Sequence, residues 1–169
     1  MRNLALALAC TILAASLSFG QQAKISSNNP LAPSFVFPAD AELIRKIRSA
    51  TEAEPGRPGL YFAELSTSPE YQVIGLRRTV TGKSELHAGI TDVWYVLKGT
   101  ATLVSGGSMI DSVEVQPGEF RGTGVKGAAD KIIRAGEFAV IPAGVAHWSR
   151  DIKGKEFIYI VVKIHSGKP

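Results

Sequence analysis

Short runs of β-forming residues, separated by turn residues, make up the chain from Leu60 onward. The runs 71–80 and 157–164, for example, are rich in Val, Ile and Tyr, and glycine, proline or serine closes most runs. About ten short strands at this close spacing indicate an antiparallel sandwich or barrel. The predicted class is all-β, with strands expected at 60–65, 71–80, 85–87, 92–98, 100–104, 110–115, 131–134, 138–141, 146–150 and 157–164.

Ahead of these strands, the pattern predicts one short helix over residues 40–49. Leu43, Ile44 and Ile47 fall on one face of that helix, and charged residues occupy most of the rest. Two prolines and two glycines in residues 51–59 predict a loop, and the glycine-rich stretch 120–130 is expected to be irregular.

The first twenty residues have the layout of a secretory signal peptide. Arg2 is followed by an uncharged apolar run over residues 4–19, and a small residue, Gly20, precedes a polar stretch. A membrane anchor is the alternative, but the run is shorter than the roughly 20 residues that a spanning helix needs. We therefore expect cleavage after residue 20, a periplasmic or secreted protein, and no membrane association after cleavage.

Cleavage would divide the chain into a signal peptide (1–20), an N-terminal arm with the short helix (21–59) and a barrel (60–169). Removing 20 of the 169 residues leaves 149, the length of one domain. Phe35 and Phe37 in the arm are expected to pack on the barrel or on a second subunit. The single cysteine, Cys10, would be lost with the signal, so any metal must be bound by histidines and carboxylates.

The charge of the chain argues against nucleic acid as a partner. There are 19 Lys and Arg residues against 15 Asp and Glu, and the basic residues form no stripe interleaved with aromatic residues. Four arginines could instead bind an acidic small molecule, namely Arg77, Arg78, Arg121 and Arg134. An arginine on a strand edge, however, more often only solvates that edge.

Four side chains with metal-binding atoms stand at two places in the strand pattern. Glu85 and His87 alternate onto one face of a short strand, and a four-residue turn brings Asp92 back as the next strand begins. His147 opens a strand much later in the chain. A barrel that brings His147 beside the other three would form a metal pocket.

The stretch around His147 resembles the second signature motif of the cupin superfamily. That motif runs Gly, five residues, Pro-x-Gly, two residues, His, three residues, Asn. The same spacing is present here in Gly136, Pro142, Gly144 and His147, with Asp151 where asparagine is usual.

The stretch around His87 is similar to the first cupin motif, in a variant form. His87 is followed after four residues by Asp92, where the family usually has Glu, and after six more by Gly99. Glu85 stands where the family has its first histidine, and Thr79 where it has its leading glycine. Together the two motifs span about residues 75–162.

The resemblance implies a jelly-roll, or double-stranded β-helix, barrel with a metal pocket. The pocket carries over directly to His87, Asp92 and His147, and to Glu85 only by position. Two imidazoles with one or two carboxylates suit divalent Fe, Mn, Zn or Ni. If Glu85 is not a ligand, it would lie beside the metal as a candidate general base.

Two neighbouring residues are candidates for lining the pocket. Trp94 shares a strand face with Asp92, and Ser149 shares one with His147. Packing in the core is the alternative for Trp94. His165, near the end of the last strand, is expected on the surface.

The resemblance leaves the kind of function open. An enzyme would act on a small oxygenated molecule through one divalent metal, as an oxidoreductase such as a dioxygenase, an isomerase or a lyase. A non-catalytic module would instead bind a sugar or another small molecule. A pocket without metal is a third reading, supported by Glu85 in a histidine position. We also expect a homodimer, paired through sheet edges and the N-terminal arm.

Overall fold

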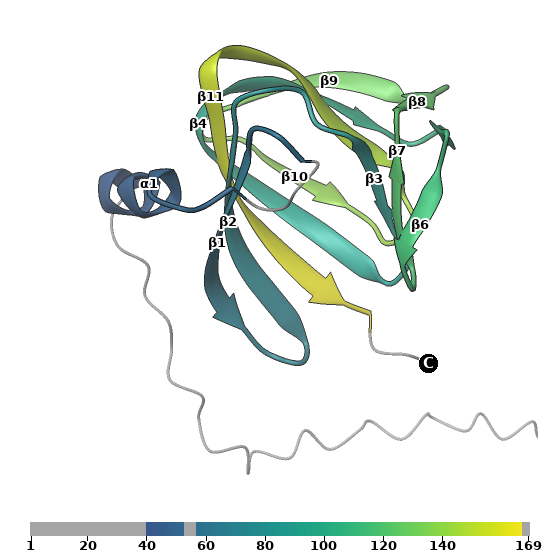
Figure 1. The fold of residues 1–169 in the computed structure, drawn as a ribbon, viewed down its shortest axis with the longest axis horizontal. Helices are drawn as coiled ribbons and strands as arrows, with labels where there is room; N and C mark the ends of the chain where they lie inside the picture. The colour runs from purple at the N-terminus through teal and green to yellow at the C-terminus, as the bar shows by residue number, and fades with distance from the viewer. Residues whose placement is uncertain (1–39, 53–56, 167–169) are drawn as a thin grey trace, which may run out of the picture. The chain divides into compact units, whose positions relative to one another are not determined.

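The computed structural model describes residues 40–52 and 57–166 (Figure 1). In these residues no helix is long and apolar enough to cross a membrane. The expected signal peptide and the arm with Phe35 and Phe37 lie outside the described residues. The elements are α1 (Asp40–Arg48), β1 (Leu60–Thr67), β2 (Tyr71–Arg78), β3 (Ser84–His87), β4 (Ile90–Ser105), β5 (Ser108–Ile110), β6 (Val113–Gln116), β7 (Glu119–Gly122), β8 (Gly124–Lys126), β9 (Ala129–Arg134), β10 (Phe138–Ile141) and β11 (His147–His165).

Two long strands, β4 and β11, hold the barrel together because each runs through both halves of it (Figure 1). The first half of β4 pairs with β10 and with the C-terminal part of β11, and its second half pairs with β9 and the N-terminal part of β11. Strands β1 and β2 extend one half, and β3, β7 and β6 extend the other. All of these pairs are antiparallel, so the predicted all-β antiparallel class with one short helix is confirmed.

The long strands correct the sequence prediction, which divided each of them in two. The expected strands 92–98 and 100–104 are one strand that continues through Gly99. Gly99 has φ of +90°, and a Cβ there would lie 2.4 Å from the carbonyl oxygen of Glu156. The expected strands 146–150 and 157–164 are likewise joined in β11, whose register against β4 shifts between Arg150 and Ile158. A glycine or a bulge can bend a strand without ending it.

Two shorter stretches also differ from the prediction. The expected strand 110–115 is divided at Asp111, where φ is +48°, into the end of β5 and the start of β6. The stretch 120–130, expected to be irregular, contains most of β7, all of β8 and the start of β9. Gly122 belongs there because a Cβ would lie 2.5 Å from the carbonyl oxygen of Ile110. Gly122 therefore lets two strands approach closely, whereas Gly127, with φ of +71°, lies between β8 and β9.

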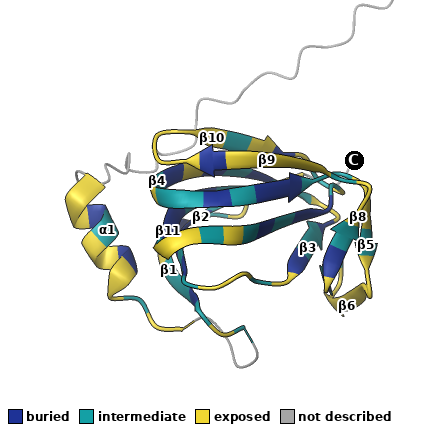
Figure 2. Cartoon of the chain, turned by 90° about the horizontal axis from the view of Figure 1, so that it is seen from above, coloured by how far each residue is buried: buried dark blue, intermediate teal, exposed yellow. Residues whose placement is uncertain are grey.

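Apolar side chains fill the barrel interior. Helix α1 packs on the outer surface of the barrel and lies beside it in Figure 2. Because side chains alternate along β11, Tyr159 and Val161 face the interior, while Ile158 packs against Leu43 and Ile47 of α1. Both faces of β11 are therefore buried here. The same alternation carries the interior row on to Lys163, at the edge of the candidate site.

Candidate metal centre

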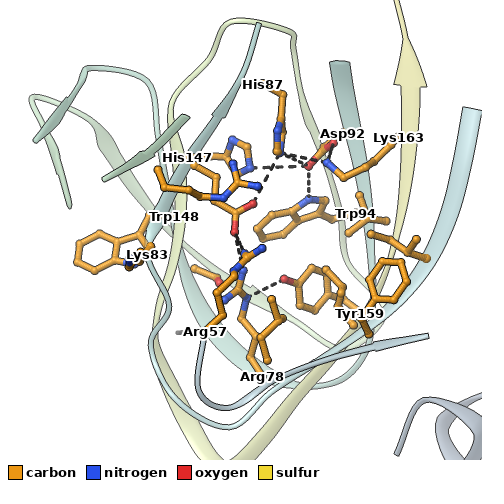
Figure 3. A pocket seen from close by; sticks show the side chains of 18 of the residues that line it. Arg57, Arg78, Lys83, His87, Asp92, Trp94, His147, Trp148, Tyr159 and Lys163 are labelled. Carbon is orange, nitrogen blue, oxygen red and sulfur yellow. Dashed lines mark hydrogen bonds and ion pairs between the residues drawn. The ribbon is translucent and has the colours of Figure 1, made fainter. Parts of the chain in front are cut away.

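The four residues predicted to bind metal come from three strands and meet at one place. Glu85 and His87 lie on β3, Asp92 near the start of β4, and His147 at the start of β11. His147 is paired in register with Glu85, and the rings of His147 and His87 lie 5.2 Å apart, centroid to centroid. Figure 3 places both rings and Asp92 around a common point. His87, Asp92 and His147 are buried.

Each imidazole turns its Nε2 atom toward this point. His87 Nδ1 lies 2.6 Å from Oε2 of Glu119, and His147 Nδ1 lies 3.1 Å from the carbonyl oxygen of Val145. Because both partners are acceptors, each neutral ring carries its proton on Nδ1 and presents a lone pair on Nε2. Burial lowers the pKa of His147, despite the opposing charges of Glu85 and Asp92, which favours this neutral form.

The Nε2 atom of His147 is buried and has no hydrogen-bond partner among residues 40–52 and 57–166. A buried polar atom left in this way carries a desolvation penalty of about 1–3 kcal/mol. A metal ion or a hydrogen-bond donor at the common point would remove this penalty.

Asp92 divides its two oxygens between the imidazoles and a cation. Its Oδ2 lies 3.6 Å from His87 Nε2 and 3.7 Å from His147 Nε2, and Trp94 Nε1 donates to the same oxygen at 3.4 Å. Its Oδ1 accepts a hydrogen bond of 3.0 Å from Lys163 Nζ. One oxygen thus remains directed at the two Nε2 atoms.

The two carboxylate oxygens of Glu85 also have different partners. Its Oε2 lies 3.7 Å from His87 Nε2, while its Oε1 accepts hydrogen bonds from Arg57 and from Arg78, the latter at 3.1 Å. Burial alone would raise the pKa of Glu85, but the charges of Arg78, Arg57 and Arg121 outweigh it and hold the pKa far below its ordinary value. A carboxylate that stays ionised in this way can serve as a metal ligand and is a weak proton acceptor.

Glu85, His87 and His147 form a group that could hold a divalent metal ion, and Asp92 lies within 3.7 Å of both imidazoles. Two neutral nitrogens and two carboxylate oxygens are suitable donors for first-row divalent metals. Two donors bonded to one ion at about 2.1 Å can be at most about 4.2 Å apart. The pairs Glu85–His87, His87–Asp92 and His147–Asp92, at 3.6–3.7 Å, meet this limit. The ligand atoms of Glu85, His87 and His147 all lie within 4.8 Å of one another.

The two predicted neighbours line the same cavity. Trp94 is buried and packs against Tyr159, with ring centroids 4.8 Å apart, and meets His147 edge-on at 5.7 Å. It belongs both to the core and to the cavity wall. Ser149 is also buried at the cavity, and its Oγ has no partner among the described residues. His165 is exposed.

The cavity beside the donors has a volume of about 260 Å³ and a basic lining. Five cationic side chains and three carboxylates line it, which leaves an excess of two positive charges when the imidazoles are neutral. Of the four arginines proposed for an acidic ligand, Arg78 and Arg121 line this cavity, whereas Arg77 and Arg134 do not. The charged lining residues are Arg57, Arg78, Lys83, Arg121, Lys163, Glu85, Asp92 and Glu119.

Three residues at this site were not predicted from the sequence. Glu119 lies opposite His87 in the β3–β7 pair, and Lys163 lies opposite Asp92 in the β4–β11 pair. Arg57 comes from the loop before β1. Only the register of paired strands, together with the path of that loop, places these three side chains, and no local motif marks them.

No family model and no curated protein matches the sequence. Solved structures do match it. An uncharacterized conserved protein with a double-stranded β-helix domain from Klebsiella pneumoniae is 15% identical, with 81% of this chain and 95% of that chain covered and a TM-score of 0.53. A predicted oxalate decarboxylase from Thermotoga maritima is 14% identical, with 70% and 96% covered and a TM-score of 0.51. A recombinant oxalate oxidase in complex with glycolate is 18% identical, with 73% and 59% covered and a TM-score of 0.50. The chain therefore has a double-stranded β-helix fold.

Proposed function

We propose that this protein is a metal-dependent enzyme that acts on a small, oxygenated, anionic molecule. His87, Asp92, His147 and Glu85 would bind one divalent ion. One observation carries the proposal: each of the four side chains directs one donor atom to a common point, while its other polar atom is held by a partner. Side chains that are oriented in this way by outer partners are typical of metal ligands.

The bound ion would supply a Lewis acid for an oxygen atom of the substrate. The chain's own residues would prepare the site for it. Glu119 would hold the His87 ring in one tautomer, and Trp94 would orient Asp92 through its hydrogen bond to Oδ2. Arg121 and Lys83 line the cavity beside these donors and would bind the negative part of the substrate.

The substrate class follows from the charges of the cavity. An excess of two positive charges, which a divalent ion would increase further, favours an anion over a neutral sugar. The oxalate oxidase that shares the fold holds glycolate, a small hydroxy acid. A small carboxylate with a neighbouring oxygen is therefore the substrate class that we propose for this chain.

Elemental analysis of the protein purified from its native compartment tests the metal. We expect about one divalent ion per chain, removed by a strong chelator. Loss of turnover of a small hydroxy or oxo acid on chelation, with recovery on adding back the metal, would support an enzyme. Unchanged ligand binding in chelator would instead favour the non-catalytic binding module, and a metal-free native protein would contradict the proposal.

Replacing Glu119 by glutamine should weaken metal binding about 10–100-fold while leaving the protein folded, because the carboxylate that orients His87 is lost. A chelator competition titration measures the affinity, and the melting temperature reports the fold. The matched control is Glu137→Gln, at an exposed carboxylate outside the site. Equal affinities for Glu119→Gln and wild type would show that His87 needs no support from Glu119.

We propose further that residues 1–20 are a signal peptide and that the mature protein is periplasmic or secreted. The support is the basic start, the apolar run and the small residue Gly20 in the sequence. The intact mass of the protein recovered from its native compartment tests this proposal. A mass that includes Met1 to Gly20 would contradict it.

A homodimer is the assembly that we propose, through the outer face of β9 and β10. Ile132, Phe138 and Val140 are 56%, 70% and 56% exposed on these strands, and β10 pairs only with β4 among the described strands. Apolar patches next to an unpaired strand edge favour a second copy as partner. Phe138→Lys should convert a dimer into a monomer in size-exclusion chromatography with light scattering, and a wild type that elutes as a monomer would contradict the proposal.

A further inference from the structure

Lys163 places an ammonium group of the chain inside the donor cluster. Its Nζ lies 3.1 Å from His87 Nε2 and 3.0 Å from Asp92 Oδ1. Figure 3 shows its side chain directed at Asp92 and His87. Two of the side chains that would bind the metal are therefore already in contact with a cation.

This position is fixed by the fold and does not depend on a flexible surface side chain. Lys163 is directly opposite Asp92 in the antiparallel β4–β11 ladder, where oppositely charged cross-strand pairs are favourable. Its side chain is only 17% exposed, and it follows Tyr159 and Val161 on the interior face of β11. The ammonium group therefore cannot turn to solvent without leaving both partners.

The contact with His87 competes with a metal ion for the same electrons. Glu119 accepts a hydrogen bond from the Nδ1–H group of His87, so the neutral ring has a single free lone pair, on Nε2. That lone pair can accept a hydrogen bond from Lys163 or bind a metal ion, but not both. Asp92 has no such conflict, because Lys163 holds Oδ1 and Oδ2 faces the imidazoles.

We propose that Lys163 is the internal cation of this cluster and that a divalent ion binds only by displacing its ammonium group from His87 Nε2. This inference rests on the metal site of the proposed function and adds a residue that sets its affinity. With no metal, Lys163 balances the buried carboxylates. With a metal, it remains on Asp92 and repels the ion, which weakens binding and makes the ion exchangeable.

The test compares Lys163→Met with wild type in two measurements on the full mature chain. Isothermal titration with Zn²⁺ and with Mn²⁺ gives the metal affinity, and the melting temperature in chelator gives the stability of the metal-free protein. We expect Lys163→Met to bind metal roughly tenfold tighter or more, because a nearby like charge is removed. We also expect it to melt at a lower temperature in chelator, because Asp92 loses its counter-ion.

Two further variants keep the result interpretable. Lys155→Met removes an exposed lysine from the same strand, outside the cavity, and should change neither measurement. Lys163→Gln removes the charge but retains a hydrogen-bond donor, so it carries the same test if Lys163→Met does not fold. It should also bind metal more tightly than wild type.

The outcomes separate this inference from the proposed function. Equal metal affinities for wild type and the Lys163 variants would overturn the inference and leave the metal site in place. Metal binding by the variants but not by wild type would support the inference and overturn a metal-dependent function for the native chain. Metal binding by none of them would overturn both.

Discussion

Replacing His87 by alanine is expected to lower the affinity for a divalent metal by roughly 100-fold. Structural zinc sites with four ligands bind with about 10–16 kcal/mol, or about 3 kcal/mol per ligand, and each 1.4 kcal/mol is tenfold. His87 is also the ring whose Nε2 atom lies within 3.7 Å of both carboxylates, so its loss removes the donor atom between them. Titration with Zn²⁺ in the presence of a competing chelator measures the change.

His165→Ala is the matched control for this experiment, because His165 is an exposed histidine at the end of β11. It should bind metal as wild type does. A His87→Ala variant that is folded and retains full affinity would contradict the metal centre at this place. A variant that loses its fold is replaced by His87→Gln, which keeps a polar side chain of similar reach.

Replacing Arg78 by methionine is expected to lower the free energy of unfolding by about 3–5 kcal/mol, because it removes one partner of a buried ion pair. Arg78 is 5% exposed, and it donates to Glu85 Oε1 at 3.1 Å and to the hydroxyl of Tyr159 at 2.9 Å. Without it, Glu85 retains only part of the charge that stabilises its buried carboxylate. Urea unfolding followed by circular dichroism measures the loss.

The pH dependence of this effect has a definite sign. The pKa of Glu85 in the folded protein lies below its ordinary value of 4.5, so its ion pairs stabilise the fold above that pH. This stability is lost as the pH falls through the folded-state pKa. In Arg78→Met, the pKa of Glu85 in the folded protein should lie closer to its value in the unfolded protein. The difference in the free energy of unfolding between wild type and variant should therefore become smaller below pH 4.5.

Arg134→Met is the control for Arg78→Met. Arg134 forms an exposed pair with Glu137 at 3.8 Å, and such pairs contribute about 0–1 kcal/mol. Equal losses for both variants would mean that the Arg78–Glu85 pair is no more important than a surface contact. A loss that does not narrow in acid would mean that Glu85 is not the partner responsible.

Local patterns were enough to predict the class of fold and both ends of each long strand to within two residues. Turn residues were read as breaks, however, and in this barrel several of them are bends. Gly99 lets β4 pass from one half to the other, and Gly122 lets two strands approach. A sequence pattern reports that the backbone can turn, but only tertiary pairing decides whether a strand ends there.

The donor residues could be predicted because their spacing along the chain is itself a motif. His87, Asp92 and His147 follow the two cupin motifs, and the folded barrel brings them together. The residues that control these donors could not be predicted in this way. Lys163 is 71 positions from Asp92, and Glu119 is 32 positions from His87, so each contact depends on strand register across the barrel.

The single strand β11 supplies both His147 at its start and Lys163 near its end. Each end of β11 pairs with a different part of β4, and the register of this pairing shifts between Arg150 and Tyr159. Pairing with β4 therefore holds His147 and Lys163 in place, and the covalent link through the bulged segment is not needed for this. A protease nick at Gly154, where φ is +82° and the chain is exposed, would leave two fragments that stay associated around an unaltered cavity.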